Sequence, residues 1–159
     1  AGRAGVPEWA RLGKRTGRTA IPLAAPGRSQ ATAVAAKLVG HRLALVLSSP
    51  PSRALDTARL AGYASRVETT DQLLEWDYGD DEGRTTAEIR ETRPAWSIWD
   101  DGPDGGESID DVAKRVDRVI TRVRAQSGDV LAFAHAHVLR ILTARWIGSP
   151  PRLGRSFVL

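Results

Sequence analysis

The sequence of 159 residues has no cysteine, no methionine and only three histidines. Without cysteine the chain can form no disulfide, thiolate nucleophile or cysteine-ligated zinc site. A metal site would need mostly carboxylate ligands, because no two histidines have the spacing of a ligand pair on a helix. We therefore expect neither a metal ion nor a cofactor.

Long apolar runs are also missing. No stretch approaches the roughly 20 apolar residues of a membrane span, and no charged segment followed by an apolar one opens the chain. We expect a cytoplasmic protein that does not associate with membranes.

Lysine is scarce, because 20 of the 23 basic residues are arginine and the net charge is +4. The basic residues are scattered, without a run of five or more, which argues against a nucleic-acid partner. Arginine suits bidentate contacts with phosphate groups. The composition favours a small phosphorylated or anionic molecule as the ligand, and homo-oligomer formation stays open.

The length corresponds to one ordinary domain, and neither a repeat nor a Pro/Gly-rich linker divides it. We therefore treat residues 1–159 as a single domain. Predicted helices and strands alternate along it, which indicates an α/β sheet with parallel strands and helices on its faces. The predicted strands are 42–47, 66–69 and 129–134, and the predicted helices are 27–40, 52–62, 86–93, 108–126 and 137–147.

Polar residues follow two of these strands. Ser48–Arg53 comes after one strand and Ala134–His137 after another, and a helix begins directly after each segment. Ligands of such sheets bind beyond the carboxyl ends of the strands, and helix N-termini favour anions. An arginine and a histidine that converge there describe a phosphate site.

Five stretches occur in the order found in one known family. They are GRTAIPLAAPGRSQA, LSSPPSRALDTA, LLEWDYGDDEG, PDGGES and AHAHVLRIL. Together they make the whole chain resemble the histidine phosphatase superfamily, which includes phosphoglycerate-mutase-like acid phosphatases. The resemblance implies a three-layer α/β/α sandwich of the phosphoglycerate mutase-like type. It also implies hydrolysis of phosphomonoesters through a phosphohistidine.

The resemblance also assigns roles to individual residues. Arg3 and Gly5 match the motif that carries the nucleophile, and Arg53 and His135 match the second arginine and histidine that hold the phosphoryl oxygens. Glu75 matches the acid that protonates the leaving group, which requires a pKa raised by burial or by a nearby anion.

Each of these matches also has a purely structural interpretation. Arg53 could be a surface ion-pair arginine, Glu75 a surface carboxylate and His135 a core histidine. Residues His41 and His137 receive only a structural role, and the acidic residues Asp77, Asp80, Asp81 and Glu82 are interpreted as a solvated face.

The sequence departs from the family at the position of the nucleophile. Ala4 occupies the position of the nucleophilic histidine, and alanine has no lone pair to attack phosphorus. Further departures are Val6, Pro7, Ala20 and Ala136. Loss of a covalent nucleophile can cost on the order of 10⁶ in turnover, so we expect the chain as written to be nearly inert.

The ends differ from the family as well. Little sequence precedes Arg3, so we expect the first strand to be missing, and the last strand is expected to be missing after Val158. Ala4 is compatible with an engineered loss of the nucleophile or with natural decay. The alternatives to a phosphatase are a non-catalytic phosphate-binding protein and a repurposed enzyme that uses Glu75 and His135 for acid/base chemistry.

Overall fold

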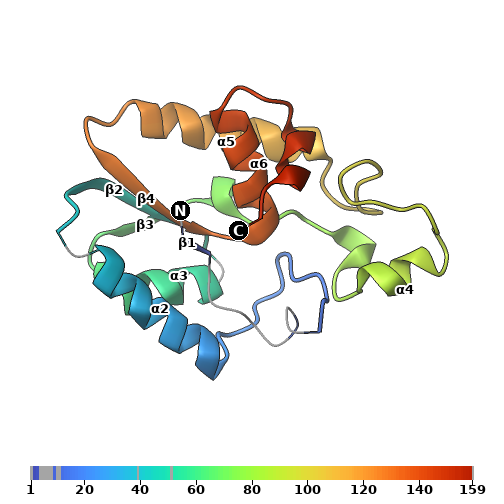
Figure 1. The fold of residues 1–159 in the computed structure, drawn as a ribbon, viewed down its shortest axis with the longest axis horizontal. Helices are drawn as coiled ribbons and strands as arrows, with labels where there is room; N and C mark the ends of the chain where they lie inside the picture. Colours follow the sequence, from blue (N-terminus) through green and yellow to red (C-terminus); the bar gives the residue numbers. More distant parts are fainter. Residues whose placement is uncertain (1, 4–8, 10–11, 39, 51, 159) are drawn as a thin grey trace.

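The computed structural model describes residues 2–3, 9, 12–38, 40–50 and 52–158. Its centre is a four-stranded sheet in the order β1-β4-β2-β3, in which all pairings are parallel (Figure 1). The strands are β1 (Gly2–Arg3), β2 (Leu43–Ser48), β3 (Val67–Thr69) and β4 (Asp129–Ala134).

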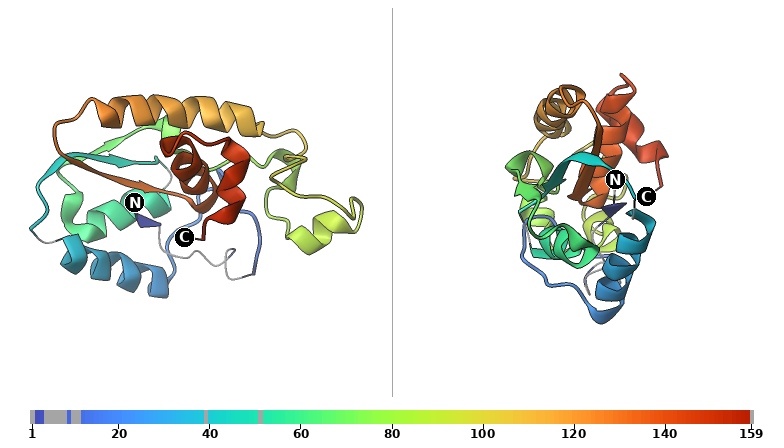
Figure 2. Two further views of the ribbon diagram at one scale, coloured as in Figure 1. Left: turned by 45° about the horizontal axis from the view of Figure 1, so that its top comes forward. Right: turned by 90° about the vertical axis from the view of Figure 1, so that its left-hand side faces the viewer.

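Helices cover both faces of this sheet (Figures 1 and 2). Helices α2 (Ala25–Leu38) and α3 (Ser52–Ala58) lie on one face. Helices α5 (Ile109–Arg124) and α6 (Ala136–Trp146) lie on the other, and the short α4 (Thr86–Arg90) lies off one end of the sheet. The three-layer architecture expected from the sequence is confirmed.

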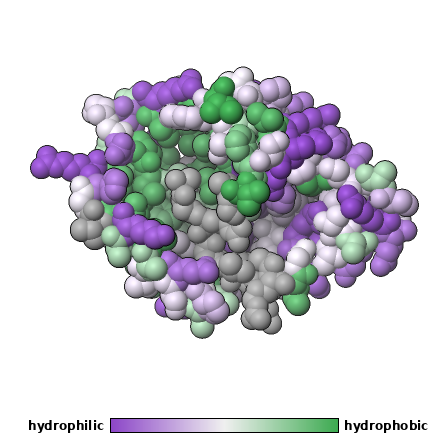
Figure 3. All heavy atoms as spheres, viewed as in Figure 1, coloured by the Kyte–Doolittle hydropathy of each residue, from purple (hydrophilic) through white to green (hydrophobic). Residues whose placement is uncertain are grey.

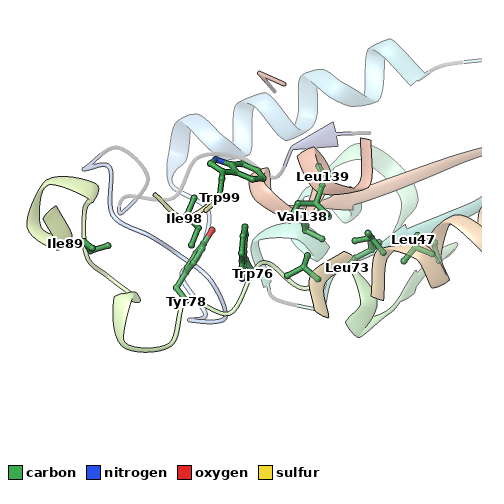
Figure 4. Packing of buried hydrophobic residues seen from close by; sticks show 14 of the residues in the cluster. Leu47, Leu73, Trp76, Tyr78, Ile89, Ile98, Trp99, Val138 and Leu139 are labelled. Carbon is green, nitrogen blue, oxygen red and sulfur yellow. The ribbon is translucent and has the colours of Figure 1, made fainter. Parts of the chain in front are cut away.

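Burial explains why each face is covered. Strand β2 is buried at five of its six positions, as a central strand with helices on both faces should be. The larger apolar cluster lies against α5 and α6 and includes Leu47, Leu73 and Trp76 (Figure 4). A smaller cluster around Val46 and Phe133 lies on the opposite face, towards α2 and α3.

Two local features refine the expected elements. A strand is present at Gly2–Arg3, although it is only two residues long, and it pairs with Phe133 and Ala134 of β4. The helix that begins at Ser52 widens at Arg59–Tyr63 and is interrupted at Gly62, as expected, because Gly62 leaves the helical conformation with φ +93°. Such a backbone conformation is cheap for glycine alone.

An apolar hollow of about 230 Å³ lies on the surface between α5, β4 and α6. Apolar side chains gather on this side of the molecule (Figure 3). The residues that line the hollow are Val119, Ile120, Val123, Val130, Ala132, Leu142 and Trp146. In the described part of the chain, every helix is too short or too polar to cross a lipid bilayer.

Candidate active site

Arg53 and His135 meet at the carboxyl ends of β2 and β4. Arg53 lies in the first turn of α3, and His135 is the residue that caps the N-terminus of α6. The Nε of Arg53 donates a hydrogen bond of 3.1 Å to Nδ1 of His135, and both side chains are almost completely buried. The interpretation of Arg53 as a surface ion-pair residue is therefore wrong.

The same guanidinium holds a loop in place. Its two terminal nitrogens donate to the backbone carbonyls of Thr16, Gly17 and Thr19, at 3.0, 2.6 and 2.9 Å respectively. Arg53 thus connects the ends of two strands to the segment that follows the N-terminal motif. The GRTAIPL stretch, which is far away in sequence, belongs to the site through these bonds.

The protonation of His135 follows from its contacts. Because Nδ1 accepts a hydrogen bond from Arg53, the ring proton of the neutral form resides on Nε2, which lies 2.9 Å from Oγ of Ser49. Burial lowers the pKa of His135 to about 4, with the charge of Arg53 acting in the same direction. At neutral pH this histidine offers an N–H donor and no positive charge.

Glu75 lies at the N-terminus of α6. Its Oε1 accepts hydrogen bonds from the backbone N–H groups of Trp76 and Val138, and its Oε2 accepts one from the N–H of His137. The helix dipole favours a negative charge at this place. With 3% of its surface exposed, Glu75 is not a surface carboxylate.

The expectation of a raised pKa for Glu75 is wrong for the free protein. Burial does raise the pKa of this carboxyl, but His137, His135 and the backbone N–H donors lower it and outweigh burial. The pKa of Glu75 therefore lies below its ordinary value, because hydrogen bonds to the charged form favour that form.

A second buried arginine supports the acidic residue. Arg115, on α5, donates to the carbonyls of Gln72, Leu74 and Glu75, and its guanidinium forms a bidentate pair with Glu107 at 2.7 and 3.1 Å. These bonds fix the backbone on the N-terminal side of the Glu75 carboxylate. Nothing in the local sequence indicates this role of Arg115, because the three carbonyls to which it donates lie 40–43 residues away in the chain.

His137 is enclosed by aromatic rings. Its ring centroid lies 5.4–6.2 Å from those of Trp76, Tyr78 and Trp99, and its Nδ1 lies 2.7 Å from the hydroxyl of Tyr78. Figure 4 shows these three aromatic side chains close together. The expected structural role of His137 agrees with this packing. Its backbone N–H also donates a hydrogen bond to Oε2 of Glu75.

The acidic segment is not a uniformly solvated face. Asp81 is fully buried and pairs with Arg93 and Arg84. Glu82 accepts hydrogen bonds from the backbone N–H groups of Gly17 and Thr19, which ties the same loop that Arg53 holds. The described residues contain no group of three or more side chains suited to a metal ion.

The N-terminal motif is described only in part. Ala4 and Gly5 lie outside the described residues, and of Arg3 the structure gives the backbone position in β1. That position pairs with Ala134, the residue directly before His135. The parallel register therefore brings the end of β1 to the same edge of the sheet as Arg53, His135 and Glu75.

Comparison with known proteins identifies the family. Residues 2–159 match the histidine phosphatase superfamily (branch 1). An acid phosphatase of Mycobacterium tuberculosis is 40% identical over 162 residues, which cover 99% of this chain and 79% of that protein.

Solved structures agree with this assignment. The product of the open reading frame Rv3214 of Mycobacterium tuberculosis superposes with a TM-score of 0.90 at 39% identity, over 99% of this chain and 83% of that one. A mycobacterial glucosyl-3-phosphoglycerate phosphatase, solved with VO3, gives a TM-score of 0.86 at 28% identity, over 98% of this chain and 83% of the other. The chain therefore belongs to the histidine phosphatase superfamily.

Proposed function

We propose that this chain binds small phosphate monoesters between Arg3, Arg53 and His135 and that its ancestral activity is their hydrolysis. As written it transfers no phosphoryl group, because Ala4 stands where the nucleophilic histidine is needed. Glu75 is the general acid of the parent reaction. The relatives that carry phosphatase names support a small phosphorylated ligand.

The contact between Arg53 and His135 carries this proposal. Phosphoryl groups are bound by fixed donors aimed at their oxygens. The contact places a permanent cation and a neutral N–H donor side by side at the start of two helices. The Nε of Arg53 and the Nδ1 of His135 are 3.1 Å apart. The Nε2–H of His135, which faces Oγ of Ser49 in the free protein, would donate a hydrogen bond to a phosphoryl oxygen.

Glu75 fits the acid role once a phosphate is bound. In the free protein its pKa is below the ordinary value, so the carboxyl is ionised at neutral pH. A phosphate dianion nearby disfavours a second negative charge and raises the pKa of a carboxyl. Binding of the substrate itself would therefore prepare Glu75 to give a proton to the leaving oxygen.

A non-catalytic phosphate-binding protein remains the second candidate, because every residue of the proposed site except Ala4 can still bind an anion. The repurposed enzyme finds less support. A general base needs a free lone pair, and His135 uses its Nδ1 lone pair to accept from Arg53 while Nε2 holds the proton.

One assay separates these functions. We would measure hydrolysis of 4-nitrophenyl phosphate by this chain and by the Ala4→His variant, and titrate both with inorganic phosphate by calorimetry. Activity in the variant alone supports a phosphatase that lacks only its nucleophile. Phosphate binding without activity in either supports the non-catalytic candidate, and absence of phosphate binding overturns the proposed site.

A further inference from the structure

The loop of residues 14–19 is attached along its first half to residues 82–85. It lies between the sheet and the α4 region (blue in Figure 1). Lys14 and Thr85 form an antiparallel bridge, and two backbone hydrogen bonds of 2.9 and 3.0 Å join Arg15 to the same segment. The loop is therefore fixed before it reaches the proposed phosphate site.

The carboxylate of Glu82 holds the second half of the loop. Both of its oxygens accept a hydrogen bond from the N–H of Gly17, at 2.8 and 2.9 Å, and Oε1 also accepts one from the N–H of Thr19 at 3.3 Å. Hydrogen bonds to an ionised acceptor are roughly twice as strong as those between neutral groups. Glu82 therefore adds a charge-assisted anchor where the backbone pairing ends.

The loop also has little space in which to move at Gly17. A Cβ atom on this residue would lie 2.5 Å from Oε2 of Glu82 and 2.8 Å from the carbonyl oxygen of Trp76. Glycine permits such a close approach of the backbone to its neighbours. The Gly17 backbone is thus packed directly against the carboxylate that binds it.

Arg53 contacts the carbonyl groups of the same loop. Loop carbonyls accept from three of its five N–H groups, and Nδ1 of His135 accepts from a fourth. A phosphoryl group that takes more than one donor of Arg53 must therefore displace carbonyls of the loop. Phosphate oxygens are the stronger acceptors because they are charged, so this displacement is limited by what holds the loop in place.

We propose that Glu82 limits the affinity of this site for phosphate, because it holds the loop on the donors of Arg53 that a phosphoryl group would use. The inference rests on the proposed function and names a control of the same site. A site whose binding-competent state is only partly populated binds with an affinity reduced by that fraction. Release of the loop from Glu82 therefore tightens phosphate binding. A residue that merely stabilised the fold would have the opposite effect, since its loss would disorder the site.

Calorimetric titration of the full chain with inorganic phosphate tests this inference. Glu82→Ala removes the charge and the acceptor oxygens, whereas Glu82→Gln removes the same charge but keeps one oxygen for the N–H groups of Gly17 and Thr19. We expect Glu82→Ala to bind phosphate about 2- to 10-fold more tightly than Glu82→Gln, the range of one intramolecular hydrogen bond. Equal affinities would show only the loss of a repelling charge and would overturn the inference, as would weaker binding by Glu82→Ala.

Asp101→Ala is the matched control. The carboxylate of Asp101 also accepts from a backbone N–H, that of Ser97 at 2.7 Å, and this residue is exposed. This contact closes the turn of residues 97–101 and does not involve the 14–19 loop. We expect the control variant to bind phosphate as the unmodified chain does. A gain in affinity equal to that of Glu82→Ala would reduce the effect to net charge and contradict a role of the loop.

NMR follows the loop itself. The N–H groups of Gly17 and Thr19 should exchange with solvent faster in Glu82→Ala than in Glu82→Gln. Phosphate should shift the resonances of residues 16–19 in the unmodified chain, because it displaces their carbonyls from Arg53. Phosphate binding that leaves these resonances unchanged would overturn the inference.

A shorter acid covers the case in which Glu82→Ala does not fold. Glu82→Asp withdraws the acceptor by one methylene and keeps the charge, so it should bind phosphate more tightly than the unmodified chain. Equal or weaker binding would overturn the inference. Absence of phosphate binding in the unmodified chain and in every variant is a different result, because it overturns the proposed function itself.

Discussion

At the scale of single residues, the phosphate binding proposed for Arg53 competes for hydrogen-bond donors with the contacts that this side chain already makes. Four of its five N–H groups already have acceptors, one on His135 and three on the carbonyls of Thr16, Gly17 and Thr19. A bound phosphate can use the remaining N–H, and it gains more contacts if the loop moves. In the proposed site, Arg53 would therefore couple phosphate binding to the position of the 16–19 segment.

Arg53→Ala should weaken binding of inorganic phosphate or vanadate about 10- to 100-fold, since a charge-assisted hydrogen bond contributes roughly 1.5–3 kcal/mol. Arg28→Ala is the control, because Arg28 is an exposed arginine in the first turn of α2. Isothermal titration calorimetry measures both. Equal effects of the two substitutions would contradict the assignment of Arg53 to the phosphate site.

Glu75 should contribute to stability in a pH-dependent way. Its pKa is lowered in the folded protein relative to the ordinary 4.5, so its contribution is present above about pH 4.5 and is lost as the pH falls through the folded pKa. Glu75→Gln places an amide NH2 against backbone donors and should cost about 1–3 kcal/mol at pH 7. Urea denaturation should show that the difference from the unmodified chain shrinks between pH 5 and pH 3. A constant difference over this range would contradict the lowered pKa.

His135 also makes the protein less stable on acidification, but over a higher pH range than Glu75. Its folded pKa of about 4 lies below the ordinary 6.5, so between these values the unfolded chain binds more protons than the folded one, and stability falls as the pH is lowered. Long-range ¹H–¹⁵N NMR should show a neutral ring with the proton on Nε2 from pH 7 down to about pH 5. A ring that becomes charged near pH 6.5 would contradict both the burial of His135 and its contact with Arg53.

At the scale of the elements, the site is a junction of helix ends, and α5 stabilises it from outside. Arg115 is the contact through which α5 holds the backbone of residues 72–75. Removing one partner of a buried ion pair leaves the other charge unpaired, which typically costs about 3–5 kcal/mol. Glu75, the proposed acid, therefore depends on α5, which contributes no residue to the proposed phosphate site.

Arg115→Ala should accordingly lower the free energy of unfolding by about 3 kcal/mol, with Arg118→Ala as the matched control. Arg118 lies three residues further along the same helix, is exposed and makes a single side-chain hydrogen bond to Gln72. Its loss should change stability by less than about 0.5 kcal/mol. Chemical denaturation distinguishes the two, and similar losses would show that the contacts of Arg115 with Glu107 and the 72–75 backbone contribute little.

The bounds of helices and strands are predictable from the sequence, whereas the contacts between distant elements are not. The strand 129–134 has the predicted bounds, and α6 begins one residue earlier than predicted, because apolar runs and breakers are local signals. The sequence mispredicts the direction of the pKa shift of Glu75, because its sequence neighbours are apolar whereas two of its three N–H donors come from α6, about 60 residues away. The sequence also places Asp81 wrongly at the surface, because its partner Arg93 is brought next to it only by α4 and the turn that follows.

At the scale of the whole molecule, the parallel sheet determines where a nucleophile at residue 4 would lie relative to the proposed phosphate site. Strand β1 ends beside Ala134, and the residue that follows it is Ala4. A displacement of about 1 Å from the reactive geometry can cost 10²-fold in rate. The short β1 must therefore hold residue 4 as firmly as a longer strand would if a histidine there is to react.

The Ala4→His variant is expected to hydrolyse phosphomonoesters and to form an acid-labile phosphoenzyme, because Arg53, His135 and Glu75 are already in place. In this background Glu75→Gln should slow alkyl phosphates about 10²- to 10⁴-fold, the contribution of general acid catalysis. It should hardly affect 4-nitrophenyl phosphate, whose leaving group departs without a proton. Steady-state kinetics with both substrates measures the contrast, and an equal loss of rate on both would contradict the assignment of Glu75 as the general acid.

The Ala4→His variant could also fold and bind phosphate but transfer no phosphoryl group. This result would implicate the other departures from the family, Val6, Pro7, Ala20 and Ala136, and would favour the non-catalytic phosphate-binding protein.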